Sequence, residues 1–330
     1  ALAEAPRVLI VGTGPEAVSL AQDLAAAHHF RREVVGMYPG SHCDAAGASM
    51  AGVAPVLDAP LGLADLVDRH RVNEVIVAVR EQRGGGVPMN ELLACRIRGV
   101  RVLDLAAYYE RARSEVRIDS LKASWLVYGD GFVQGPLRQA AKRSFDIVSS
   151  VLLLLLASPV MLLAMLAIRL DSPGPVLYRQ ERVGLGGRSF MCIKFRSMRT
   201  DAEKDGVARW ATKNDSRVTR VGAFIRKTRI DELPQLISVL KGEMSMVGPR
   251  PERPSFVAQL REQIPFYDLR HSVKPGVTGW AQVRYSYGAS VEDARRKHQY
   301  DLYYVKHNSL FLDMLVLLET VSVVLFREGQ

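Results

Sequence analysis

An uncharged stretch of 22 residues, Ile147 to Ile168, constrains the fold of this chain more than any other feature. A helix rises about 1.5 Å per residue, so this length is sufficient to span the ~30 Å hydrocarbon layer of a bilayer. Pro159 lies in the middle of the stretch, where it removes a helical hydrogen bond and clashes with the preceding turn. The sequence therefore predicts a kink there. Ser158 beside it can satisfy a backbone group that the proline leaves free.

Basic residues flank this stretch on both sides. Because Lys and Arg prefer the cytoplasmic face of a membrane, two basic flanks fit poorly on opposite faces. A kinked helix that enters the membrane and returns to the same leaflet satisfies both, and we predict such a re-entrant anchor over residues 137–170. A straight crossing and a buried helix of a soluble core are the alternatives. The flanking residues are Arg138, Lys142 and Arg143 before the stretch and Arg169, Arg179, Arg182 and Arg188 after it.

Positive charge is confined to the second part of the chain. Residues 1–136 carry a formal net charge of −2, from 14 Lys and Arg against 16 Asp and Glu, whereas residues 137–330 carry +11, from 30 against 19. A basic domain suits an anionic partner, and nucleic acid, anionic lipid and phosphate-bearing substrates all qualify. The three cysteines are far apart and the seven histidines form no HxxxH or HxxH pair. This excludes a disulfide framework and a thiolate zinc site, so any metal is expected to be a hard cation held by carboxylates.

Strands and helices alternate through residues 1–115, which predicts a doubly wound parallel sheet with helices on both faces. The motif Gly12-x-Gly14-x-x-Ala17 follows the first strand, as in Rossmann-type dinucleotide-binding domains. The second strand does not end in the acidic residue that would bind a ribose, and a tight strand-to-helix turn explains the glycines equally. We interpret residues 1–115 as a Rossmann-like, regulatory domain without a defined ligand, followed by a linker at residues 116–136.

Four compact motifs follow one another in the basic part. In this order they resemble those of the bacterial polyprenyl-phosphate sugar-1-phosphate transferases, the monotopic phosphoglycosyl transferases. The resemblance covers about the last 190 residues. The Rossmann-like part is similar, through weaker motifs, to the extra domain of the large members. Those members usually carry transmembrane helices ahead of it, and we expect the protein to continue before Ala1. The motifs are Lys194-Phe-Arg196-Ser-Met-Arg199, Arg226-Lys-Thr-Arg229-Ile-Asp231-Glu232-Leu-Pro234-Gln235, Val247-Gly-Pro249-Arg250-Pro251 and Lys274-Pro-Gly276-Val-Thr278-Gly-Trp280-Ala-Gln282.

The resemblance implies an enzyme that transfers a sugar-1-phosphate from a UDP-sugar to polyprenyl (undecaprenyl) phosphate and releases UMP. This is the first membrane step of exopolysaccharide or related glycan assembly. It implies Asp231 as the nucleophile that forms a covalent aspartyl-phosphosugar, with Glu232 as a metal ligand or in handling the proton of the acceptor phosphate. A compact α/β catalytic domain, residues 171–330, is then expected on the cytoplasmic face of the bacterial inner membrane.

The acidic pair precedes a helical run that Pro234 opens and Gly242 ends. Asp231 and Glu232 are therefore expected at a helix N-terminus, where free N–H groups favour anions. A simple N-cap at Asp231 and a surface ion pair with Lys227 explain the same spacing. A carboxylate that attacks a pyrophosphate is repelled by its negative charge. For two unit charges about 4 Å apart, this repulsion costs about 1 kcal/mol in water and about 4 kcal/mol at an effective dielectric of ~20. The reaction therefore needs Mg²⁺ or Mn²⁺, held by the acidic pair, and positive side chains nearby.

The candidate substrate-binding residues lie in the same motifs. Arg250 stands between two prolines that fix the backbone on both sides, which presents its guanidinium with little freedom. Lys194 and Arg196 alternate as on a strand, so both are expected to point to one face, toward phosphate or toward lipid headgroups. The full set is Lys194, Arg196, Arg226, Arg229, Pro249, Arg250 and Pro251.

Two other classes of protein remain open. A nicotinamide-dependent sugar-nucleotide oxidoreductase would use Gly12–Ala17, but the sequence lacks a visible Tyr-x-x-x-Lys pair in the expected region and leaves the basic part unexplained. A non-catalytic membrane adaptor would only recruit proteins of polysaccharide assembly. The expected partners are a UDP-sugar, polyprenyl phosphate and inner-membrane lipid, and no nucleic acid. The sequence leaves open which sugar is transferred and whether the chain forms a homo-oligomer.

Overall fold

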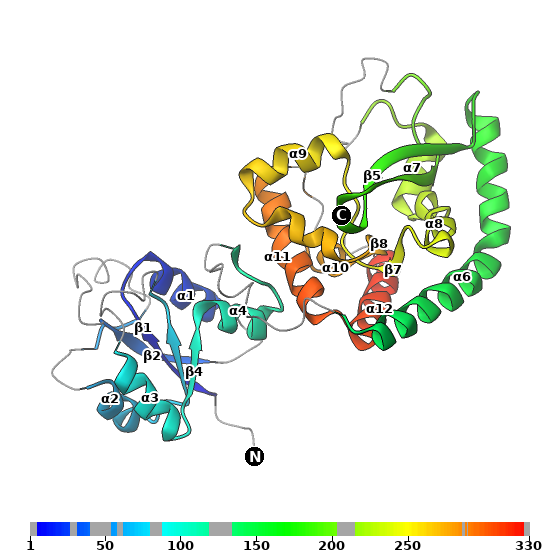
Figure 1. Ribbon diagram of the computed structural model, residues 1–330. Coiled ribbons are helices and arrows are strands. Elements are labelled where there is room, and N and C mark those ends of the chain that lie inside the picture. Colours follow the sequence, from blue (N-terminus) through cyan, green and yellow to red (C-terminus); the bar gives the residue numbers. More distant parts are fainter. Residues whose placement is uncertain are drawn as a thin grey trace. The chain divides into compact units, whose positions relative to one another are not determined.

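The computed structural model describes residues 5–26, 32–39, 54–57, 62–79, 88–118, 134–202, 215–285, 288 and 290–326 (Figure 1). The chain divides into two compact units, Ala1–Leu121 and Lys122–Gln330. The division lies within the linker predicted at residues 116–136, of which residues 119–133 lie outside the described part.

A parallel four-stranded sheet with the order β2-β1-β3-β4 forms the centre of the first unit. Its central strand β1 is fully apolar after Arg7, and these four residues are buried. Because successive side chains of a strand point to opposite faces, two cores form. One contains α2 and α3, and the other α1 and α4. The elements are β1 (Arg7–Val11), α1 (Pro15–Ala26), β2 (Glu33–Tyr38), α2 (Leu63–Arg69), β3 (Glu74–Val77), α3 (Met89–Ile97), β4 (Arg101–Asp104) and α4 (Leu105–Arg113).

The turn after β1 requires a glycine for reasons of backbone geometry alone. Gly12 has φ +120°, and a Cβ at this position would lie 2.8 Å from the Ala78 carbonyl oxygen. Its N–H donates to the Tyr38 carbonyl at 2.9 Å. An L side chain would be both strained and obstructed here. The first glycine of the predicted fingerprint is thus explained by the crowded end of the sheet, without any ligand.

The second unit begins with one long helix and continues as a mixed α/β body. Its strands form an antiparallel hairpin of β5 and β6 and a parallel pair of β7 and β8. The elements are α6 (Pro136–Asp171), β5 (Leu177–Val183), η3 (Leu185–Gly187), β6 (Ser189–Phe195), α7 (Arg220–Lys227), η4 (Ile230–Glu232), α8 (Gln235–Lys241), β7 (Ser245–Val247), α9 (Pro254–Gln263), η5 (Tyr267–Ser272), β8 (Gly276–Thr278), α10 (Trp280–Arg284), α11 (Val291–His307) and α12 (Leu310–Phe326).

Helix α6 runs without interruption through Pro159, and Figure 1 shows that it bends. The predicted kink is therefore present as a bend, and the helix is continuous through it. Pro159 cannot donate to the carbonyl of Leu155, and the Ser158 hydroxyl donates to that carbonyl at 2.8 Å instead. The predicted role of Ser158 is confirmed. The helix keeps its hydrogen bonding because a side chain replaces the lost backbone donor.

Both ends of α6 are attached to the same unit. Near its start, Lys142 donates to the fully buried Asp313 of α12 at 2.6 Å, and Arg143 binds the last carbonyls of α8 at 2.6 and 2.7 Å. Near its end, Ile168 packs against Phe195 of β6. A straight crossing would separate these two ends by the thickness of the membrane, so the attachment argues against it.

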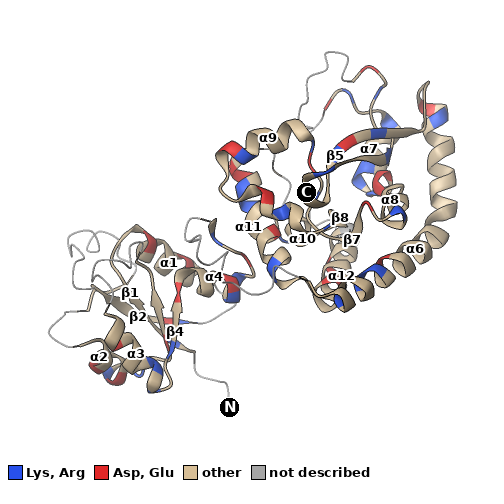
Figure 2. Ribbon diagram, viewed as in Figure 1, with Lys and Arg blue, Asp and Glu red and all other residues tan. Residues whose placement is uncertain are grey.

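The middle of α6 presents an apolar surface to the surroundings. Of its most apolar 18-residue window only 11% is buried, and Figure 2 shows this part free of charge. Among the described residues, α6 is the one helix that is long and apolar enough to cross a membrane, by length and composition alone. Among the described residues, the middle of α6 is therefore not buried in the core of the second unit. The exposed side chains include Val148, Leu152, Leu155, Leu156, Leu162, Leu163 and Leu166.

The bend predicts that both flanks of α6 face the same side of a membrane. We expect single cysteines at Arg138 and Arg179, after replacement of Cys43, Cys95 and Cys192, to react with an impermeant thiol reagent from the same side of sealed vesicles. Labelling in inside-out, right-side-out and opened vesicles measures this.

Reaction of the two positions from opposite sides would contradict the bent anchor. Pro159→Leu provides the matched comparison, because it restores the backbone donor to Leu155 and removes the cause of the bend. We expect this variant to place the two cysteines on different sides or to lose the packing of the unit.

Candidate active site

The acidic pair lies in a tight turn between two helices. After α7 the chain takes a left-handed conformation at Arg229 (φ 60°) and forms the single 3₁₀ turn η4, which contains Asp231 and Glu232. Helix α8 begins only at Gln235, with Pro234 as its N-cap. The predicted position at a helix start is thus displaced by one turn toward the N-terminus. Both carboxyl side chains are buried, at 8% and 7% exposure.

Glu232 collects three cationic side chains on one carboxylate oxygen. Arg250 donates to its Oε1 at 2.9 Å, Lys194 donates at 3.1 Å, and Arg229 lies at 3.9 Å. Burial alone would raise the pKa of Glu232, but the charges of Arg250, Lys194 and Arg229 outweigh it and hold the pKa well below its usual range. Glu232 is therefore ionised at neutral pH and fixes the cations around it.

Asp231 lies beside this cluster without a comparable partner. Its Oδ1 is buried and accepts no hydrogen bond within the described residues. Burial, and then the negative charge of Glu232, raises the pKa of Asp231 to about 6, although the neighbouring cations partly oppose the shift. Two adjacent carboxyl groups thus have environments that move their pKa values apart, an arrangement typical of catalytic sites. Among the described residues, Asp231 Oδ1 thus keeps an unused acceptor beside the cluster around Glu232.

Lys194 is confirmed as a neighbour of the acidic pair, but Arg196 is not brought there. The Arg196 guanidinium is buried and donates to the carbonyls of Ser172 at 2.7 Å and Pro173 at 3.0 Å, just after the end of α6. The expectation that both side chains serve one phosphate site is not supported. Arg196 instead ties the end of α6 to β6.

Arg226 acts electrostatically on Asp215. Hydrogen bonds from Arg217, against a small opposing effect of burial, lower the pKa of Asp215 to about 2, and the charge of Arg226 contributes to this. Arg226 is half-buried near the end of α7. Its predicted contact with substrate stays a prediction.

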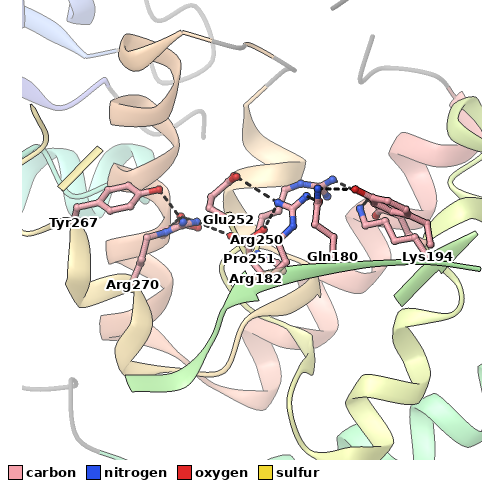
Figure 3. Close-up of polar contacts among 11 residues, drawn as sticks. Gln180, Arg182, Lys194, Arg250, Pro251, Glu252, Tyr267 and Arg270 are labelled. Carbon is pink, nitrogen blue, oxygen red and sulfur yellow. Dashed lines mark hydrogen bonds and ion pairs between the residues drawn. The ribbon is translucent and has the colours of Figure 1, made fainter. Parts of the chain in front are cut away.

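The loop Pro249–Pro251 reaches the acidic pair through Arg250, and two further arginines hold its backbone (Figure 3). Arg182 of β5 donates to the Pro251 carbonyl, and Arg270 of η5 donates to the Arg250 carbonyl, both at 2.9 Å. Neither was among the candidate residues. The sequence marked Arg182 only as one of the basic residues that flank the apolar stretch. No local pattern predicts the pairing of Arg270 with Asp301, which lies 31 positions later.

The site offers some, but not all, of the ligands that a hard divalent cation requires. Among the described residues no group of three or more His, Cys, Asp or Glu side chains surrounds a common point. Asp231 and Glu232 offer two carboxylates, and the buried Asp231 Oδ1 still has an unused acceptor. Mg²⁺ commonly binds one or two carboxylates and takes its other ligands from phosphate and water. The donor set therefore suits a cation that arrives with a phosphorylated substrate.

Comparison with known proteins identifies the family. Residues 137–327 match the model described as "Bacterial sugar transferase", and the chain belongs to this family. It is 42% identical over 259 residues to a UDP-N-acetylgalactosamine-undecaprenyl-phosphate N-acetylgalactosaminephosphotransferase of Aeromonas hydrophila, with 78% of this chain and 60% of the relative covered. The resemblance drawn from the motifs is thereby confirmed.

Two further relatives match a smaller share of the chain. One is a UDP-glucose:undecaprenyl-phosphate glucose-1-phosphate transferase of Escherichia coli K12, 47% identical over 182 residues, covering 54% of this chain and 39% of the relative. The other is the exopolysaccharide production protein PSS of Rhizobium leguminosarum bv. phaseoli, 45% identical over 192 residues, covering 56% of this chain and 96% of the relative. The chain spans only 60% and 39% of the Aeromonas and Escherichia proteins.

The raised pKa of Asp231 predicts a pH-dependent difference between the wild type and Asp231→Asn. Because the pKa of about 6 in the folded protein lies above the ordinary 3.8, folding takes up a proton between these values. The wild type therefore loses stability as the pH rises through about 6, whereas the variant does not. The stability of Asp231→Asn relative to the wild type should rise by on the order of 1–3 kcal/mol from pH 4 to pH 7.5.

Denaturant unfolding of the full chain at a series of pH values measures this difference. Glu262→Gln is the matched control, because Glu262 is an exposed carboxylate in the same unit. Its stability relative to the wild type should stay flat over the interval. A flat profile for Asp231→Asn would contradict the environment assigned to Asp231.

Proposed function

We propose that the chain transfers a sugar-1-phosphate from a UDP-sugar to polyprenyl phosphate and releases UMP. The observation that carries the proposal is the buried, unpaired carboxyl of Asp231 next to Glu232, which three cations surround. The proposal is supported by the family and by the activities for which the Aeromonas and Escherichia relatives are named. The oxidoreductase and adaptor alternatives have no comparable support.

The proposed chemistry has two displacements at the same phosphorus. The ionised Asp231 oxygen attacks the phosphorus that bears the sugar. The bond from that phosphorus to the bridging oxygen of the diphosphate breaks, and its electron pair leaves with UMP. A phosphate oxygen of the acceptor lipid then attacks the aspartyl-phosphosugar, and the bond between Asp231 and phosphorus breaks. The product is polyprenyl diphosphosugar, and the Asp231 carboxylate is regenerated.

Lys194 and Arg250 are placed to counter the charge that these steps bring together. Without substrate they share Glu232 Oε1, at 3.1 and 2.9 Å. A diphosphate at Asp231 offers them further acceptors, and the planar guanidinium of Arg250 suits two phosphate oxygens at once. Glu232 keeps both cations next to the reacting phosphorus, which is the electrostatic stabilisation that phosphoryl transfer depends on.

We propose that Mg²⁺ or Mn²⁺ binds with the nucleotide sugar at Asp231 and Glu232. When bound, the cation supplies positive charge that stabilises the diphosphate of the leaving group. Asp231 and Glu232 are the protein ligands that we propose for the cation, because the described residues contain no larger cluster of acidic side chains.

We propose that α6 is a re-entrant anchor in the bacterial inner membrane, with the second unit on the cytoplasmic face. The exposed apolar middle of the helix and the attachment of both its ends to one unit support this. The strand order β2-β1-β3-β4 supports a Rossmann-like assignment for the first unit, for which we propose a regulatory role.

Asp231→Asn should lower UMP release by on the order of a thousandfold or more, because Asn lacks the nucleophilic oxygen. The measurement uses UDP-sugars with and without polyprenyl phosphate, followed by mass spectrometry of the wild type after UDP-sugar alone. We expect a phosphosugar adduct on Asp231. Glu262→Gln serves as the control and should react like the wild type. An adduct on another residue would overturn the assignment of Asp231.

Removal of divalent cations should abolish transfer. The like charges of carboxylate and diphosphate repel each other by about 4 kcal/mol per pair at an effective dielectric of ~20, and the three basic side chains already share Glu232. UMP release in excess EDTA, then with Mg²⁺ or Mn²⁺ added back, measures this. Full activity in the chelator would show that the basic side chains suffice.

A further inference from the structure

Several polar contacts fix the backbone of the loop that carries Arg250. A small hollow is lined by Pro249–Pro251 and by residues of η5. The Arg250 side chain has a defined direction, since Nη2 donates to Glu232 Oε1 at 2.9 Å. The Gly276 N–H donates to the Pro249 carbonyl at 3.0 Å. Arg270 and Arg182 donate to the next two carbonyls of the loop, those of Arg250 and Pro251, both at 2.9 Å.

Arg270 provides one of these contacts and is itself held on all sides. Its Nη2 donates to the Arg250 carbonyl at 2.9 Å, and Nη1 donates to the Tyr267 hydroxyl at 2.9 Å. Nε and Nη2 donate to Asp301 Oδ2 at 3.1 and 2.8 Å. Figure 3 shows Tyr267 and Arg270 approaching the Arg250 loop from the side away from Lys194. The side chains of Arg270 and Asp301 are only 5% and 3% exposed.

A buried ion pair of this kind is a poor explanation of stability alone. Well-packed apolar side chains of similar volume often replace such a pair without loss, because removing two charges from water is costly. An apolar pair could not hold the Arg250 carbonyl. The donors of a guanidinium lie in one rigid plane, and this geometry lets Arg270 bind a carbonyl, a hydroxyl and a carboxylate together.

We propose that Arg270, fixed by Asp301 and Tyr267, is a positioning residue that acts through the Arg250 carbonyl. It sets the direction in which Arg250 meets the diphosphate of the nucleotide substrate. The inference rests on the proposed function, because it needs Arg250 to bind substrate phosphate. It assigns Arg270 no contact with the substrate itself.

A double-mutant cycle tests this route. Arg270→Lys keeps the charge next to Asp301 but loses the planar fork. In the full chain it should weaken UDP binding and slow UMP release by about tenfold, whereas in an Arg250→Ala background it should change either quantity by less than about twofold. UDP affinity is measured by isothermal titration. Arg261→Lys is the matched control, because Arg261 forms an exposed ion pair with Asp268. It should leave both quantities unchanged.

An equal loss in the two backgrounds would overturn the proposal, since a purely structural role does not depend on Arg250. Unchanged affinity and rate in Arg270→Lys would also overturn it. If Arg270→Lys does not fold, Tyr267→Phe is read by the same criteria, because it removes one hydroxyl that accepts from Arg270 and keeps the ring.

The two readouts separate this inference from the proposed function. A wild type that binds UDP and shows the expected cycle but releases no UMP would refute the transfer and retain the positioning role. Release of UMP with an additive cycle would refute only the positioning role. A wild type that binds no UDP overturns both.

Discussion

Glu232 is the residue on which the arrangement of the site depends. Its carboxylate binds Lys194 of β6 and Arg250 of the loop after β7. It also lies near Arg229, which directly precedes η4. These segments are far apart in the sequence, and their positive charges would repel one another without a shared anion. A buried carboxylate with three cations remains ionised, and Asp231 Oδ1 is left without a hydrogen bond from the described part of the chain. The pKa values of the two neighbouring carboxyl groups therefore differ because the cations bind Glu232 and not Asp231.

The same unit uses long side chains to fix its apolar helix. Lys142 and Asp313 join the beginning of α6 to α12, while Arg196 closes its end against the turn at Ser172. These contacts lie on the side of α6 that faces the body of the unit, so the apolar middle is left exposed. The geometry of the helix is thus set by the residues outside its apolar stretch together with the proline inside it.

Local patterns predicted the parts of this structure that depend on local physics. The presence of β1 and β2, the bend at Pro159 and the hydrogen-bonding role of Ser158 follow from strand composition and proline stereochemistry. The approximate position of Asp231 and Glu232 followed from Pro234 and Gly242. Strand alternation placed Lys194 and Arg196 on one side of β6 but could not show that α6 ends in front of Arg196. The pairs Lys142–Asp313 and Arg270–Asp301 join residues 171 and 31 positions apart, and no local rule links them.

The attachment of both ends of α6 to one body has a consequence for how the two proposed substrates arrive. In the proposed arrangement, the bent helix holds the second unit against the bilayer and limits its rotation. The proposed lipid phosphate would then reach Asp231 by diffusion within the membrane plane, whereas the nucleotide sugar would approach from the aqueous volume beside it. One substrate would thus diffuse in two dimensions and the other in three. The anchor would contribute to the reaction by keeping Asp231 at the membrane surface, where both can reach it.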